Sequence, residues 1–192
     1  MGLEYRVGRG NCFDLRYKIA SSSHKYFGVS FVKEIQNIGM LKEDKNRFMQ
    51  MAIDLSQYAL DSKCGGPFGA IIVKNGKVIG SSGNRVFADC DPTAHAEVMA
   101  IRDACKNLKD TDLTGCEIYT SAEPCPLCTA AIYWSKLDAV YYSNTEEESM
   151  QYGYTDKLIL AELRKPKEKR KLLFKRIKNP QALQIFQRAL ES

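Results

Sequence analysis

Four side chains in two short segments have the residue types and spacing of a catalytic metal centre. His95 and Glu97 lie two residues apart in the first segment, and Cys125 and Cys128 lie three residues apart in the second. One imidazole and two thiolates fill three positions of a zinc ion and leave the fourth open to water. Such an ion lowers the pKa of its bound water to about 7, and a nearby carboxylate can then move protons. We predict one zinc ion per chain on His95, Cys125 and Cys128, with Glu97 as the catalytic acid and base.

Helix geometry decides whether these side chains can meet. The two cysteines share one helical face if the prolines on either side of Cys125 start a helix. His95 and Glu97 would point apart within a helix and can serve one site only in its first turn. Asp91 followed by Pro92 supplies a capping carboxylate and a proline at the first helical position, so we expect the helix to begin there. Two helix N-termini aimed at one point also favour thiolates.

A closed structural zinc site is the main alternative. Each cysteine or histidine taken alone is more typical of a core or surface position than of a ligand. Candidates for a fourth protein ligand are Cys64, Cys90, Cys105 and Cys116. Structural sites usually pair two C-x-x-C motifs and have no use for Glu97, so the pattern favours the catalytic interpretation.

These strings resemble those of a known enzyme family. His95-Ala96-Glu97 and the residues 124–128, Pro-Cys-Pro-Leu-Cys, resemble the cytidine deaminase superfamily, and the longer strings resemble its guanine deaminase branch. The resemblance runs from about Met40 to the C-terminus. It implies a three-layer αβα domain of the α/β class, with a central mixed sheet of about five strands. It also implies a homodimer and zinc-dependent hydrolytic deamination of a free purine base, guanine to xanthine plus ammonia.

Three further residues are candidates for holding the base. Asn84 follows a predicted strand, and its carboxamide can both donate to and accept from a base edge; a turn asparagine is the alternative. Phe68 follows Gly-Gly-Pro and is either a core residue or, as the resemblance implies, an aromatic that packs on the base. Asp156 ends a Gly-Tyr-Thr-Asp string similar to one in the guanine deaminase branch, where the aspartate accepts from the base. Its alternative role is a helix cap.

Hydrophobic periodicity predicts the elements that position these residues. Two strands flank Asn75-Gly76, which is a strong hairpin signal. Tyr133 and Trp134, at the end of the second ligand helix, are expected in the core, and the alternative is that one of them lines the cavity. The predicted helices cover 42–62, the zinc helix through Leu108, the second ligand helix through Trp134, 157–163 and 182–190, and the predicted strands cover 70–73, 77–79, 117–120 and 139–143.

Composition is that of a globular protein. The 192 residues are 44% hydrophobic and 27% charged, enough for one domain with a core. Seven cysteines, an odd number without a disulfide framework, favour reduced thiols and a cytoplasmic location. No apolar run approaches the roughly 18 residues of a membrane span. We assign residues 40–192 to the deaminase domain and 1–39, which include His24, to an extension of unassigned role that we expect to be dispensable or poorly ordered.

A basic run near the C-terminus keeps a second substrate class open. Nine Lys and Arg residues lie between Leu163 and Lys178, opposed only by Glu168. A solvated tether is the favoured interpretation, and a nucleic-acid surface is the alternative. The corresponding rival function is a tRNA adenosine deaminase, which the acidic residues 146–148 disfavour. A cytosine or nucleoside deaminase also fits, and the alternative outside enzymes is a zinc-bound interaction module.

Overall fold

The computed structural model describes residues 45–190 of the chain. The expected extension 1–39, its boundary at residue 40 and His24 lie outside these residues. The described part divides into two compact units, one that ends at Thr155 and one that begins at Asp156. Within this part, every helix is too short or too polar to cross a membrane.

A mixed four-stranded sheet forms the centre of the first unit. The strands are β1 (Gly69–Lys74), β2 (Lys77–Gly83), β3 (Cys116–Ala122) and β4 (Ala139–Asn144). Their order is β2-β1-β3-β4, with β1 antiparallel to both of its neighbours and β3 parallel to β4. The predicted mixed sheet is confirmed, with four strands in the described residues where we expected about five.

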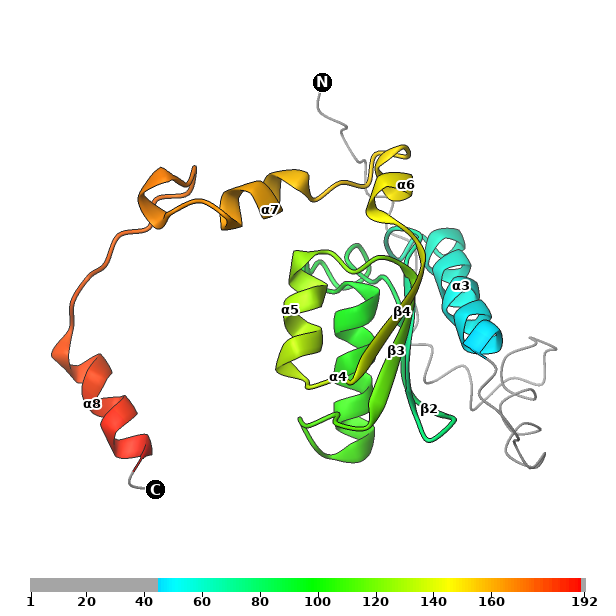
Figure 1. Cartoon of the computed structure of the whole chain (residues 1–192), viewed down its shortest axis with the longest axis horizontal. Coiled ribbons are helices and arrows are strands. Elements are labelled where there is room, and N and C mark those ends of the chain that lie inside the picture. The colour runs from blue at the N-terminus through cyan, green and yellow to red at the C-terminus, as the bar shows by residue number, and fades with distance from the viewer. Residues whose placement is uncertain (1–44, 191–192) are drawn as a thin grey trace. The chain divides into compact units, whose positions relative to one another are not determined.

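Helices cover both faces of this sheet. Helix α3 (Lys45–Asp61) lies on one face, and α4 (Ala96–Leu108) and α5 (Pro126–Trp134) lie side by side on the other (Figure 1). Strand β1 is buried on both sides, because successive side chains alternate between faces: Ile71 joins the core under α3, and Ile72 joins the core under α4 and α5. This is the predicted three-layer αβα architecture.

The hairpin between β1 and β2 follows from its turn residues. Asn75 and Gly76 both have positive φ, at 50° and 72°, which is the conformation of a two-residue type I′ turn. Asparagine and glycine adopt it at little cost. The hairpin predicted from this pair is confirmed.

Helix α5 is buried along only a narrow stripe. Cys128 and Ile132, four residues apart, are its buried side chains. Tyr133 and Trp134 are 79% and 87% exposed. The expectation that these two aromatics lie in the core is therefore wrong, because they fall outside the face that meets the sheet.

A short acidic helix follows β4. Helix α6 (Glu146–Met150) begins with three glutamates and is capped by Thr145, whose side chain accepts from the Glu148 N–H while the Glu148 carboxylate accepts from the Thr145 N–H. This reciprocal capping box, together with negative charge at a helix N-terminus, explains why the acidic triplet forms a first turn.

The second unit consists of short helices separated by the basic run. These are α7 (Lys157–Leu163), the 3₁₀ helix η1 (Lys167–Lys169) and α8 (Pro180–Ala189). The Arg170 guanidinium donates to the carbonyl oxygens of Leu163 and Lys165. Most other side chains of the basic run are exposed, in agreement with a solvated segment.

Candidate active site

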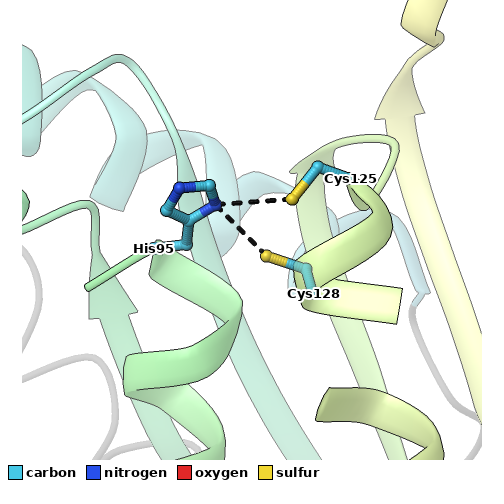
Figure 2. Close-up of side chains that lie close together, drawn as sticks. All are labelled: His95, Cys125 and Cys128. Atoms are coloured by element: carbon cyan, nitrogen blue, oxygen red, sulfur yellow. Dashed lines mark hydrogen bonds between the residues drawn. The ribbon is translucent and has the colours of Figure 1, made fainter. Parts of the chain in front are cut away.

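The three predicted metal ligands meet between the N-terminal ends of α4 and α5. His95 Nδ1 lies 3.5 Å from Cys125 Sγ and 3.4 Å from Cys128 Sγ (Figure 2). Tetrahedral zinc, with bonds of about 2.0 Å to nitrogen and 2.3 Å to sulfur, separates these atoms by about 3.6 Å. Both sulfurs approach the same ring nitrogen, as two ligands of one ion approach a third. The cluster therefore fits a shared zinc ion.

The arrangement also leaves a coordination position open. Among the described residues, the metal-competent group contains His95, Cys125 and Cys128 and no fourth side chain. The alternative of a closed structural site lacks the ligand that it requires. Outside the cluster, the thiols of Cys90, Cys105 and Cys116 are free and do not approach it.

Local backbone structure explains how His95 and the cysteines come to face one another. Cys125 has an extended backbone and is the N-cap residue of α5, which begins with Pro126, as predicted. His95 likewise is the N-cap residue of α4. The predicted helix start at Asp91 is wrong, because that carboxylate accepts hydrogen bonds from the N–H and hydroxyl of Thr93 and closes a local turn instead. His95 and Cys125 thus both lie at the N-terminal end of a helix.

Proton sharing inside the cluster prepares it for a cation. A hydrogen bond from Cys128, with further help from His95, lowers the pKa of Cys125 to about 4. The Cys125 sulfur and burial raise the pKa of Cys128, and the hydrogen bond with Cys125 raises the pKa of His95. The metal-free site therefore holds a thiolate together with protons that a bound zinc ion must displace.

Glu97 lies in the first turn of α4 and outside the ligand cluster. Its side chain is buried, with 5% of its surface exposed, and burial raises the pKa of its carboxyl group. The Thr120 hydroxyl, from β3, lies 3.3 Å from Glu97 Oε1 and 3.1 Å from the Ala122 carbonyl oxygen. A desolvated carboxyl group with a raised pKa holds a proton more readily than an exposed one does, and it can both take and return a proton as a general acid and base.

The sheet places Phe68 and Asn84 at the edge where the ligand segments begin. Gly69 pairs with Gly83, and Ala70 pairs with Thr120, so the start of β1 lies between the ends of β2 and β3. The Asn84 N–H donates to the Phe68 carbonyl oxygen at 2.8 Å, which joins the two loops.

The Asn84 carboxamide uses its oxygen in a hydrogen bond and has its NH2 group available to a ligand. The side chain is buried, and its Oδ1 accepts a hydrogen bond from the Val86 N–H at 3.1 Å. This is the turn that the alternative interpretation predicted. Among the described residues, no acceptor lies within hydrogen-bonding distance of the Nδ2 atom, so the carboxamide retains two donors for a ligand.

Phe68 is half-buried and contacts an aromatic that the sequence analysis did not select. Its ring packs edge-on against Tyr154, with centroids 5.0 Å apart and an interplanar angle of 87°. It also packs against the core under α4 and α5, so both of its predicted roles are compatible with its position. Tyr154 follows Gly153, whose φ of 88° turns the chain after α6. Gly153 was the available sequence signal for a turn. Phe68 lies 86 positions before Tyr154 in the chain, so the contact between the two rings could not be inferred.

Asp156 is the N-cap residue of α7 and belongs to the second unit. Its side chain makes no capping hydrogen bond, and its Oδ1 is buried without a hydrogen-bond partner. The helix-cap alternative therefore lacks its characteristic contact. The role of Asp156 toward a base stays a prediction.

Comparisons with known proteins agree with this site. Residues 42–144 match the family described as the cytidine and deoxycytidylate deaminase zinc-binding region. The chain is 43% identical over 140 residues to guanine deaminase of Bacillus subtilis, covering 73% of this chain and 90% of that protein. The crystal structure of a guanine deaminase from the same organism superposes with a TM-score of 0.75 at 40% identity, covering 78% and 96% of the two chains.

A relative with another substrate class is also similar. A tRNA-specific adenosine deaminase of Aquifex aeolicus is 39% identical over 104 residues, which cover 54% of this chain and 68% of that protein. All of these relatives are deaminases, and the matched region contains the complete His95, Cys125 and Cys128 cluster. The chain therefore belongs to the zinc-dependent cytidine and deoxycytidylate deaminase family.

Proposed function

We propose that this chain deaminates free guanine to xanthine and ammonia, as a hydrolase acting on a cyclic amidine. The observation that carries the proposal is a cluster of three metal ligands with a buried carboxyl group next to it. This group belongs to Glu97, which is not one of the ligands. The similarity to a guanine deaminase over 90% of that relative's length supports the choice of base.

The proposed mechanism assigns the metal and the carboxylate separate tasks. A zinc ion on His95, Cys125 and Cys128 supplies Lewis-acid activation of water. Glu97 takes a proton from the attacking water and delivers it to the exocyclic nitrogen, which leaves as ammonia. The hydrogen bond between Thr120 and Glu97 holds the carboxylate in position, and its burial excludes bulk water from the proton transfer.

The proposed base contacts follow from hydrogen-bonding capacity. Asn84 presents two N–H donors, which suit a ring nitrogen lone pair or a carbonyl oxygen of the base. Asp156 carries a buried oxygen without a partner, which suits an N–H or amino group. Phe68 is braced by Tyr154 and offers a ring face or edge to the aromatic base.

The rival function, deamination of adenosine in tRNA, has two observations in its favour. They are the 39% identity to a tRNA-specific relative and the exposed basic run of the second unit. The charge at the sheet edge disfavours it. Asn144 pairs with Ala122 at the end of β3, which leads to Cys125, and the glutamates of α6 begin two residues after Asn144. Three negative charges there would repel a phosphate backbone.

We further propose that the chain forms a homodimer and works in the cytoplasm. Several large apolar side chains of α5 and β4 are exposed in the single chain, and a second copy would cover them. They are Leu127, Tyr133, Trp134, Val140 and Tyr142. The cytoplasmic assignment rests on cysteine usage alone, as predicted from sequence.

Ammonia release from a panel of substrates tests the proposed function. Zinc-loaded full-length protein is incubated with guanine, adenine, cytosine, their nucleosides and tRNA. The proposal expects guanine to give the largest kcat/KM. Faster turnover of tRNA, with a steep dependence on salt, would replace it with the rival function. A zinc-loaded protein that releases ammonia from none of these would leave the interaction-module interpretation.

A further inference from the structure

The segment Gly65-Gly66 forms a surface on which two of the proposed base contacts rest. A Cβ atom added at Gly65 would overlap Asn84 Oδ1 and would lie 2.8 Å from Asn84 Cγ and 2.9 Å from the Asn84 backbone carbonyl oxygen. A Cβ added at Gly66 would instead meet the Phe68 ring, at 2.9 Å from Cε2, and Tyr154 at 3.6 Å. Neither glycine has a positive φ, so backbone conformation does not require glycine at these positions. The close contacts with neighbouring atoms do.

Three contacts together fix the Asn84 carboxamide. The Asn84 backbone N–H donates to the Phe68 carbonyl oxygen, its Oδ1 accepts from the Val86 N–H, and its Oδ1 and Cγ occupy the space that a Cβ atom at Gly65 would fill. Rotation of the amide about its terminal torsion would break the bond to Val86. These contacts leave the Nδ2 hydrogens available to donate to a ligand.

The loop that contains Asn84 is also tied to the zinc ligands. The Arg85 N–H donates to the carbonyl oxygen of Ala94, the residue before His95, at 2.9 Å. The N–H groups of Phe87 and Ala88 both donate to the Cys64 carbonyl oxygen, next to Gly65. The glycine, the asparagine and the first metal ligand therefore belong to one hydrogen-bonded framework.

We propose that Gly65 is a positioning residue for substrate recognition, which holds the Asn84 carboxamide with its amide N–H groups directed to the base. This inference rests on the proposed function and extends it. The substrate must then present an acceptor, a ring nitrogen or a carbonyl oxygen, to Asn84. A side chain at position 65 would displace the carboxamide and remove that hydrogen bond without touching the zinc cluster.

A double-mutant cycle tests the proposal in the zinc-loaded full chain. Gly65→Ala should lower kcat/KM for guanine by about 10- to 100-fold, the value of one lost hydrogen bond plus an unpaired donor. The loss should fall mainly on KM, and zinc content should stay at one ion per chain. In the Asn84→Ala background the same glycine substitution should cost at least about fivefold less than in the wild type, because the carboxamide that it displaces is absent and only the contact with the backbone oxygen of residue 84 remains.

The neighbouring glycine supplies the matched control. Gly66→Ala adds the same methyl group one residue later, against the Phe68 ring, and should give equal losses with and without the Asn84 carboxamide. Equal losses for Gly65→Ala in the two Asn84 backgrounds, or no loss at all, would overturn the proposal. Where Gly65→Ala does not fold, recovery of folding in Gly65→Ala/Asn84→Ala supports the contact, and failure of both variants to fold overturns it.

The cycle separates this inference from the proposed function. Wild-type protein that carries zinc and releases no ammonia from guanine would refute the proposed function, and this inference would fall with it. An active wild type combined with additive Gly65 and Asn84 losses would refute the positioning role alone.

Discussion

Replacing Glu97 with glutamine separates the chemistry of the site from its metal binding. The substitution keeps the size of the side chain and an oxygen that can accept from the Thr120 hydroxyl, but it removes the ionisable group. Glu97 lies outside the ligand cluster, so Glu97→Gln should retain one zinc ion per chain.

The expected loss follows from the number of proton transfers. One positioned acid or base contributes about 10²- to 10⁴-fold, and Glu97 serves both the attack and the departure of ammonia. We expect kcat to fall at least about 10³-fold, or roughly 4 kcal/mol of transition-state stabilisation. KM should change little, because the proposed base contacts lie elsewhere.

Steady-state ammonia release and zinc content, measured on the same preparation, check this prediction. Glu117→Gln is the matched control, because that carboxylate also accepts a hydrogen bond from a hydroxyl, that of Tyr119, but lies at the opposite end of β3. The control should keep activity within about twofold. Zinc-loaded Glu97→Gln protein with more than a tenth of wild-type kcat would remove Glu97 from the mechanism.

The remaining predictions concern binding, pH and domain limits. Asn84→Asp should lower kcat/KM at least as much as Asn84→Ala, about 10-fold or more, because a carboxylate cannot donate to the base. Zinc affinity, measured by competition with a chelator, should fall as the pH is lowered, by about tenfold per pH unit for each proton that zinc displaces, because the pKa values of His95 and Cys128 are raised. Burial raises the folded-state pKa of Glu97 above its unfolded value, so its contribution to stability is full below the unfolded pKa and is lost as pH rises through the folded pKa. In differential scanning calorimetry, metal-free Glu97→Gln should therefore unfold at a higher temperature than metal-free wild type at pH 8, with a smaller difference at lower pH. A chain that starts at Met40 should keep wild-type kcat/KM in the ammonia assay.

Local sequence signals were sufficient for the elements and for the metal centre. Asn75 and Gly76 determine a turn by their own conformational preferences, and the hairpin follows. Cys125 and Cys128 are held three residues apart by one helix whose start is marked by a proline. Each of these features depends on neighbours within a few positions, which a sequence displays directly.

The errors occurred where a local signal had a competing local use. Asp91 has the side chain of a helix cap, but Thr93 offers it two donors within a turn, and the helix begins later, with His95 as its N-cap. Trp134 was expected in the core because of its size, yet the buried stripe of α5 passes through Ile132. Burial depends on which face meets the sheet, and periodicity over nine residues defines that face poorly.

The contact between Phe68 and Tyr154 joins distant segments without a ligand motif that would have predicted it, and it separates the chemistry of the site from its proposed selectivity. The zinc ligands lie within the family's zinc-binding region, residues 42–144, where strand pairing fixes the ends of three strands together. Tyr154, which braces Phe68, comes after that region, and so does Asp156. We therefore expect a framework that fixes the metal and the proton carrier to serve several amino-bearing bases, and we expect the segments after β4 to select among them. Substitutions at Tyr154 should therefore change the ratio of kcat/KM between bases and leave the zinc content unchanged. Substitutions at Cys128 should abolish both zinc binding and ammonia release from every base.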